Sequence, residues 1–109
     1  MNGEELKRTV SSGGIVYGTM LTNARNPRWA APISEMGFDY IIIDTEHTPR
    51  DRDDVADFLA AMDPSGPVPI VRIPIPDSHY VTMALDAGAH GVLVPYCETV
   101  EEVTEVVAA

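Results

Sequence analysis

Three titratable side chains directly follow an apolar run in the middle of the sequence. The segment IIIDTEHTP (41–49) places Asp44, Glu46 and His47 just after three isoleucines. A β-branched run of this kind is typical of a strand that is buried on both faces in a parallel sheet. Histidine is the side chain best suited to proton transfer near neutral pH, and a nearby carboxylate supports that role. The segment therefore predicts proton-transfer chemistry at the carboxyl end of a buried strand.

A second ionisable group ends another apolar run. Arg72 follows VPIV (68–71), and a cation in an apolar strand is costly unless it meets an anion. The guanidinium could bind a substrate carboxylate through two parallel hydrogen bonds, or it could pair with Asp44 or Glu46. The spacing of these residues leaves both interpretations open.

Predicted strands and helices alternate four times along the chain. We predict strands at 13–20, 38–44, 68–74 and 90–95, and helices at 26–37, 51–62, 77–88 and 99–109. Asp77 and Thr99 occupy helix N-cap positions. Pro32 requires the first of these helices either to kink or to start late. The alternation predicts an α/β fold with a parallel sheet and right-handed crossovers.

Two architectures fit this pattern, namely a small open α/β sandwich and part of a (β/α)₈ barrel. A complete barrel usually needs ~250 residues, so this chain would supply about half of one. We expect residues 1–109 to form a single domain. In either architecture, functional groups gather where the strands end and the helices begin.

Charge and apolar patterning argue against several classes of partner. The formal net charge is -10, and no Lys or Arg follows Arg72, so nucleic acid and anionic membranes are disfavoured. No apolar run approaches the ~20 residues of a membrane span, and the N-terminus MNGEELKRTV is too polar for a signal peptide. The single cysteine, Cys97, rules out an internal disulfide. We therefore expect a cytoplasmic protein with no nucleic-acid or membrane partner.

Three segments, taken as a set and in order, carry a resemblance to a known family. GFDYIIIDTEHTPRD, PIVRIP and ALDAGAHGVLVPYCET resemble the HpcH/HpaI aldolase family of metal-dependent pyruvate aldolases. The resemblance runs from about Gly18 to the C-terminus and implies the N-terminal half of a (β/α)₈ TIM barrel. It implies a carbon–carbon lyase that cleaves a 2-keto acid to pyruvate and an aldehyde. It also implies a divalent metal, Mg²⁺ or Mn²⁺, that holds pyruvate and stabilises its enolate.

The same resemblance implies roles for three residues. His47 would be the general base acting through bound water, and Arg72 would stabilise charge on the pyruvate and aldehyde oxygens. Asp86, in LDAG, matches the acid that assists this histidine. Asp86 nevertheless ends a predicted helix, and that end of a βα unit points away from the expected site. Asp44 is a geometrically easier partner within one chain, so both aspartates remain candidates, Asp86 also from a neighbouring subunit. We expect His47 and Arg72 to face a common hollow.

The sequence favours metal chemistry over a Schiff base, yet it does not contain a recognisable metal site. The only lysine, Lys7, precedes the first predicted strand, whereas Schiff-base aldolases need a lysine in the pocket. By the resemblance, the metal ligands are a glutamate and an aspartate on later barrel strands, beyond residue 109. Glu46 could contact the substrate or a metal-bound water, but one carboxylate does not hold Mg²⁺ or Mn²⁺.

Three hypotheses about function follow from these observations. The first is a pyruvate-type aldolase whose site is completed by a complementary half-barrel or by other copies in a homo-oligomer. The second is an oxaloacetate- or acyl-CoA-directed lyase of the same superfamily. The third is a non-catalytic truncated half-barrel or partner subunit that lacks the metal site, since a half-barrel leaves strand edges and inward side chains uncovered.

Overall fold

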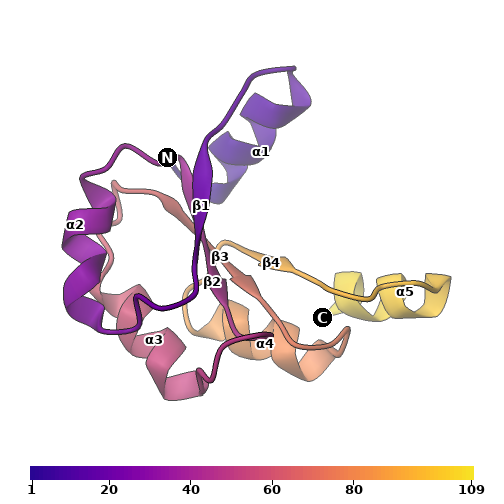
Figure 1. Cartoon of the computed structure of the whole chain (residues 1–109). Coiled ribbons are helices and arrows are strands. Elements are labelled where there is room, and N and C mark those ends of the chain that lie inside the picture. The colour runs from indigo at the N-terminus through magenta and orange to yellow at the C-terminus, as the bar shows by residue number, and fades with distance from the viewer.

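Four parallel strands form one sheet in the order β1-β2-β3-β4. The computed structural model describes residues 1–109 and is drawn in Figure 1. The strands are β1 (Gly18–Leu21), β2 (Tyr40–Asp44), β3 (Val68–Arg72) and β4 (Gly91–Leu93). A doubly wound sheet reverses its strand order at a switch point. Here each strand pairs with the next one along the chain, which is the order of a barrel wall.

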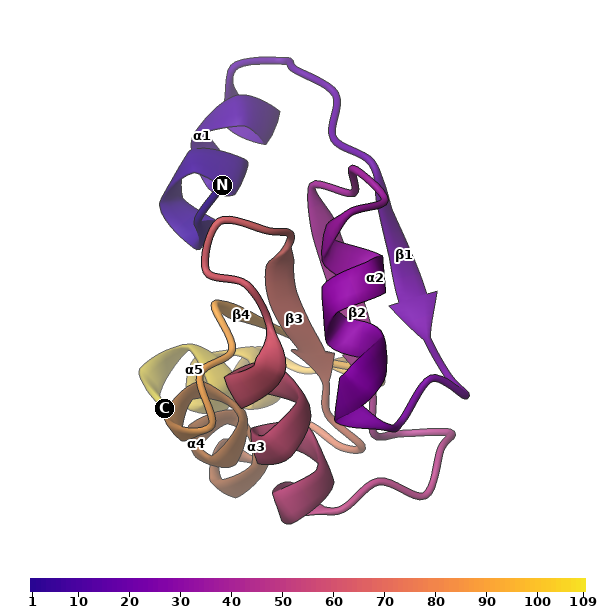
Figure 2. The same ribbon diagram turned by 90° about the vertical axis from the view of Figure 1, so that its left-hand side faces the viewer.

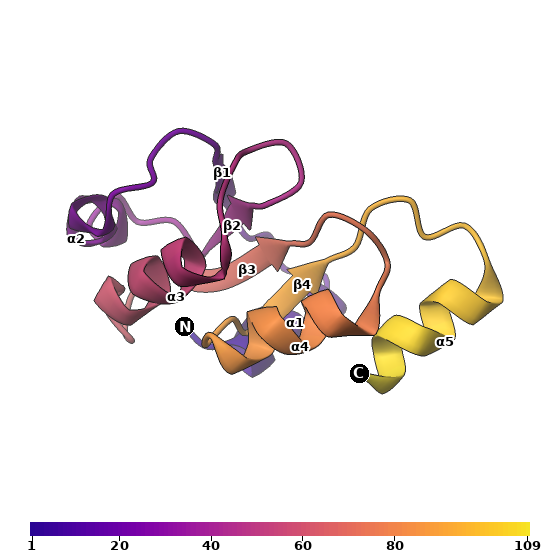
Figure 3. The same cartoon turned by 90° about the horizontal axis from the view of Figure 1, so that it is seen from below.

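Helices connect the strands and cover one face of the sheet. They are α2 (Ala30–Ser34), preceded by the 3₁₀ turn η1 (Pro27–Trp29), then α3 (Arg52–Ala61) and α4 (Ser78–Asp86). The last helix, α5 (Val100–Ala108), follows β4 and lies beside α4. Figure 3 shows α2, α3 and α4 following one another around the outside of the sheet. This cover and the strand order together give a partial (β/α)₈ barrel of four βα units, which confirms the predicted fold class.

The core lies between the sheet and the helices. Ile41 and Ile43 of β2 and Val71 of β3 are at most 2% exposed and belong to one buried cluster. The helices contribute Ile33, Val55, Phe58, Leu59, Val81 and Ala84 to this cluster. Figure 2 shows α2 and α3 lying across the same side of the sheet. Each such large side chain contributes roughly 1.5–3 kcal/mol when it is fully buried, so this face determines the register of the strands.

The opposite face of the sheet carries apolar side chains that are not fully buried. Met20 and Ile42 are half-buried there, and Leu93 is 40% exposed. Helix α5 likewise contains no buried residue, and its Val100 and Val107 are 77% and 78% exposed. In a closed barrel, surfaces of this kind meet further strands and helices.

One helix was not predicted. Helix α1 (Gly3–Ser11) is capped by Asn2 in a capping box with Glu5, a pattern that the sequence contains but that we did not identify. The helix lies at the amino ends of the strands (Figure 1), where the Gly3 N–H donates to His90 Nδ1 at 3.2 Å. None of the helices combines the length and the apolar character that a membrane span requires.

The boundaries of the first predicted elements were also inaccurate. The first strand begins at Gly18 and not at residue 13, because Gly13 has a φ of +86° and turns the chain after α1. Helix α2 starts at Ala30, so that Pro32 falls in its first turn. The late start was one of the two solutions that the proline allowed.

Candidate active site

Asp44, the last residue of β2, is the centre of a polar cluster at the carboxyl ends of the strands. Its side chain is fully buried. Oδ1 accepts hydrogen bonds from Arg72 Nε at 3.0 Å and from the backbone N–H groups of Glu46 at 2.9 Å and His47 at 3.3 Å. Burial alone would raise the pKa of this carboxyl group, but the hydrogen bonds outweigh it, so the pKa of Asp44 lies below its usual range. Asp44 is therefore ionised and organises both the strand end and the loop after it.

Arg72 lies beside Asp44 because the two residues are register partners on neighbouring strands. The Arg72 side chain is 20% exposed. Its hydrogen bond to Asp44 raises the pKa of Arg72 against the opposing effect of burial. Only Nε is engaged in that bond, so the two terminal nitrogens have no partner within the chain. Arg72 thus pairs with Asp44 and still presents donors to a ligand, so that the two interpretations of the sequence are compatible.

The ring of His47 contacts Glu46 and not an aspartate. His47 Nε2 lies against Glu46 Oε1, and 62% of the histidine side chain is exposed compared with 9% of the glutamate. Asp44 instead accepts the backbone N–H of His47 and forms an ion pair with Arg72. The sequence did not single out Glu46 as the partner of this ring. A carboxylate at Nε2 orients the imidazole and supports proton transfer.

Asp86 does not reach this cluster within the chain. It is the exposed last residue of α4. The segment that follows α4 adjoins the amino half of β3, because the His90 N–H donates to the carbonyl oxygen of Pro69 at 2.9 Å. His47 lies at the opposite, carboxyl edge of the sheet. Any assistance from Asp86 to His47 would have to come from another subunit.

Two carboxylate oxygens of the cluster are buried without a hydrogen-bond partner, namely Asp44 Oδ2 and Glu46 Oε2. Buried polar atoms nearly always have a hydrogen-bond partner, because an unpaired one has lost its hydrogen bonds to water and gained none within the protein. These two acceptors accompany the unengaged donors of Arg72. The cluster is therefore suited to a bound group that both donates and accepts hydrogen bonds, such as water or a hydroxylated acid.

The residues present do not fit the divalent metal that the resemblance implies. No three His, Cys, Asp or Glu side chains converge anywhere in the chain. Asp44 is neutralised by Arg72, which leaves Glu46 as the remaining carboxylate of the cluster. Mg²⁺ and Mn²⁺ prefer about six oxygen ligands. Residues 1–109 therefore do not form the metal site by themselves.

Two further residues, to which the sequence assigned no role in the site, reach the same edge of the sheet. Arg50 donates hydrogen bonds to three backbone carbonyls. Tyr96, after β4, is the one non-glycine residue with a positive φ, at 56°, and its side chain is 64% exposed. A bulky residue in this conformation is unusual and often marks a functional loop. Neither residue has a sequence signature, since lone arginines and aromatics are common in loops.

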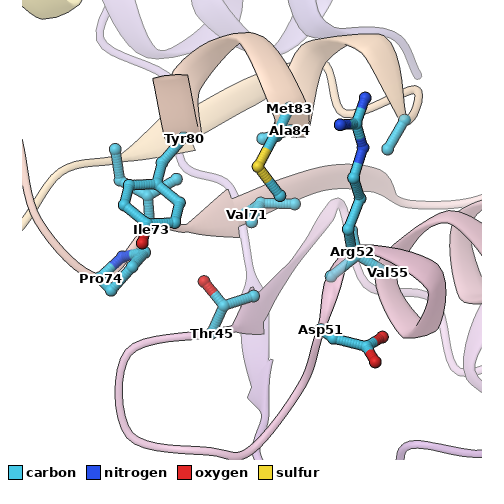
Figure 4. Close-up of a pocket in the computed structure, with 11 residues that line it drawn as sticks. Thr45, Asp51, Arg52, Val55, Val71, Ile73, Pro74, Tyr80, Met83 and Ala84 are labelled. Carbon is cyan, nitrogen blue, oxygen red and sulfur yellow. The ribbon is translucent and has the colours of Figure 1, made fainter. Parts of the chain in front are cut away.

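An apolar cavity of about 80 Å³ lies on the helix side of the sheet, between β3, α3 and α4 (Figure 4). Thr45 lines it, and the Thr45 hydroxyl donates to the carbonyl oxygen of Arg72 at 2.6 Å. The cavity is separate from the polar cluster. No cavity within the chain is lined by both His47 and Arg72, so this chain alone does not enclose the hollow that we expected them to share.

Comparisons with known proteins point to one family. Residues 19–109 match the HpcH/HpaI aldolase/citrate lyase family. A hydroxypyruvate/pyruvate aldolase of Roseobacter denitrificans is 34% identical over 103 residues, which cover 94% of this chain and 40% of the relative.

Solved structures give the same result. The HpcH/HpaI aldolase of Desulfitobacterium hafniense has a TM-score of 0.83 and 34% identity, covering 94% of this chain and 39% of that one. The citrate synthase SbnG has a TM-score of 0.81 and 30% identity, covering 94% and 41%. The chain thus spans about 40% of the length of these proteins.

Proposed function

The chain belongs to the HpcH/HpaI aldolase/citrate lyase family, and we propose that it supplies the general base and the anion-binding arginine of a carbon–carbon lyase. The reaction is the aldol cleavage of a hydroxylated 2-keto acid to pyruvate and an aldehyde, or the reverse condensation. The 34% identical relative from Roseobacter denitrificans is a hydroxypyruvate/pyruvate aldolase. The observation that carries the proposal is the geometry at the ends of β2 and β3, where one aspartate binds both Arg72 and the backbone of His47.

In this proposal, Arg72 binds the oxygens of the keto acid. Asp44 holds the guanidinium in place through Nε, and the two terminal nitrogens face the ligand. Positive charge that is already oriented where an enolate forms stabilises the transition state without reorganisation. Glu46 contributes a buried acceptor for a hydroxyl group or a bound water.

His47 moves the proton. The imidazole removes the proton of the substrate hydroxyl, directly or through water, and the carbon–carbon bond between the carbinol carbon and the keto-acid methylene then breaks. The electron pair of that bond becomes the enolate of pyruvate, and the aldehyde leaves. The imidazolium of His47 then returns a proton, directly or through water, to the enolate carbon, which gives the methyl group of pyruvate. Glu46 keeps the ring oriented through its contact with Nε2.

We further propose that other polypeptide surfaces complete the site. The ligands for Mg²⁺ or Mn²⁺ come from outside residues 1–109, in a complementary half-barrel. Other copies in a homo-oligomer could cover the open face of the sheet, but they would not bring the glutamate and aspartate ligands that the resemblance implies. The lack of any three converging metal-binding side chains and the uncovered apolar face of the sheet support this. We also propose that residues 1–109 fold as one domain, as their single core suggests, and that the protein is cytoplasmic.

Two other functions are each favoured by one observation. The likeness to the citrate synthase SbnG favours an oxaloacetate- or acyl-CoA-directed lyase, in which Arg72 would bind a carboxylate. The absence of a metal-ligand set in the chain favours a non-catalytic partner subunit.

Deuterium incorporation into the methyl group of pyruvate tests the proposed function. The chain is assayed in D₂O with Mg²⁺ or Mn²⁺, alone and co-purified with the part of the Roseobacter denitrificans aldolase that it does not cover, and pyruvate is analysed by mass spectrometry. We expect metal-dependent exchange in the completed protein. His47→Ala should reduce it by roughly 10²–10⁴-fold, the contribution of a general base.

His79→Ala is the matched control, because His79 is an exposed histidine on α4 and should leave the exchange unchanged. Exchange that is equal in wild type and His47→Ala would contradict the proposal. A co-purified, folded complex without exchange would favour the non-catalytic reading.

A further inference from the structure

Arg50 joins two loops at the carboxyl edge of the sheet. Its Nη1 donates to the carbonyl oxygen of Leu21 at 2.8 Å, and its Nη2 donates to that of Ala24 at 3.2 Å. Nη1 also donates to the carbonyl oxygen of Asp44 at 3.5 Å. One guanidinium therefore connects the end of β1, the segment after it and the end of β2.

Arg50 lies on the loop that also carries Glu46 and His47. Asp44 holds the near end of this loop. Its Oδ1 accepts hydrogen bonds from the backbone N–H groups of Glu46 and His47, and its carbonyl oxygen accepts one from the Thr48 hydroxyl. The far end is held by Arg50. Because 62% of the His47 side chain is exposed, packing does not determine where the imidazole lies. Its place depends on the backbone of residues 45–50, which carries both His47 and its contact partner Glu46.

The environment of Arg50 is unusual for a cation. It is partly buried and has no ion pair with any carboxylate. Burial, followed by the neighbouring charge of Arg25, lowers the pKa of Arg50. A guanidinium stays charged nonetheless, and burying an unpaired charge is costly. The charges of Asp44 and Asp54 favour the cation without forming an ion pair with it. The direct contacts of the guanidinium are with backbone carbonyls, and they require the planar fork of an arginine, which a lysine cannot reproduce.

We propose that Arg50 is a positioning residue for proton transfer, which holds residues 45–50 so that His47 stays beside the end of β3. Arg50 acts through the loop and touches no reacting atom. Its effect on catalysis rests on the proposed function, whereas its effect on the loop does not.

Amide hydrogen exchange of the folded chain, followed by NMR, tests the effect on the loop. Arg50→Ala should accelerate exchange of the Glu46 and His47 amides at least about tenfold, the factor expected when a charge-assisted hydrogen bond is lost. Arg50→Lys should not restore protection. Arg52→Ala is the control, because Arg52 is an exposed arginine two residues along the chain without a side-chain hydrogen bond, and it should leave these amides unchanged.

Three results would overturn the inference. The loop amides could exchange equally in wild type and Arg50→Ala. Arg50→Lys could match wild type, which would mean that charge alone matters. The amide of Ile43 in the core could accelerate by the same factor as the loop amides, which would mean that Arg50 stabilises the whole fold and not the loop.

The methyl-exchange assay on the completed protein tests the catalytic effect. Arg50→Ala should lower kcat about tenfold and leave the KM for pyruvate nearly unchanged, because Arg72 still binds the keto acid. A raised KM with unchanged kcat would contradict a positioning role. If wild type itself shows no exchange, the proposed function fails, and the amide measurements still decide whether Arg50 holds the loop.

Discussion

The buried Asp44–Arg72 pair should contribute measurably to the stability of the chain. Asp44→Asn keeps the shape of the side chain and removes the charge that accepts three hydrogen bonds. A hydrogen bond to a charged group contributes ~1.5–3 kcal/mol and a neutral one ~0.5–1.5 kcal/mol, so each bond should lose about 1 kcal/mol. Arg72 is 20% exposed and can be partly hydrated, which reduces the total loss from about 3 to about 2 kcal/mol.

Urea unfolding followed by circular dichroism measures this loss. For a small protein the free energy of unfolding falls by roughly 1–3 kcal/mol per molar urea, so the midpoint for Asp44→Asn should fall by about 0.7–2 M. Asp86→Asn is the matched control, because Asp86 is exposed at the end of α4 and such substitutions change stability by less than about 0.5 kcal/mol. Adding Arg72→Met to Asp44→Asn should recover part of the loss, since the unpaired cation is then gone. Equal midpoints for the two asparagine variants would refute the reasoning.

Three further predictions concern acid stability, backbone strain and the core. The folded-state pKa of Asp44 lies below its usual 3.8, so the unfolded chain binds a proton first as the pH falls. The stability that the Asp44–Arg72 pair contributes is therefore complete above about pH 5 and is lost as the pH falls through the folded-state pKa. Asp44→Asn should flatten the acid side of a plot of urea midpoint against pH. Tyr96→Gly should leave the free energy of unfolding unchanged or raise it by up to about 1 kcal/mol, because it relieves a positive φ at a largely exposed side chain; a loss above about 1 kcal/mol in urea unfolding would contradict this. Ile43→Ala should lower the free energy of unfolding, measured with urea, by about 2–5 kcal/mol. Ile42→Ala should lower it by less than half as much, since Ile42 lies on the face of the sheet without helices; equal losses would place the core on both faces.

Local sequence signals predicted most of the fold. The aspartate and threonine at 77 and 99 cap their helices as expected, because an N-cap depends on hydrogen bonds within one turn. The isoleucine run predicted β2 because a parallel strand is covered on both faces in a finished barrel. Helix α1 contains an equally local signal in Asn2 and Glu5, and Leu6 and Val10 lie at helical spacing. The segment is otherwise polar and no residue of it is buried, so composition alone did not distinguish it from a loop.

The contacts of the site were less predictable, because they depend on which residues the sheet brings together. The sequence offered Asp44 or Asp86 as the partner of His47, yet Asp44 is taken by Arg72 through the strand register. The three carbonyls that Arg50 binds come from two different strands and the segment between them. No spacing within the sequence reports such a combination, since it is set by tertiary packing.

The position of the charged pair is determined by residues on the other side of the sheet. Side chains alternate along a strand, so Ile43 and Val71 face the helices while Asp44 and Arg72 face away from them. The register pairs Ile43 with Val71 and Asp44 with Arg72. A shift of one residue would move the apolar set out of the core and lose roughly 1.5–3 kcal/mol for each large side chain. Attraction between the two charges is a weaker determinant, because their desolvation offsets much of it. The helix-side core therefore places the pair, and this explains how a chain spanning about 40% of its relatives' length holds the pair in register without the remaining strands.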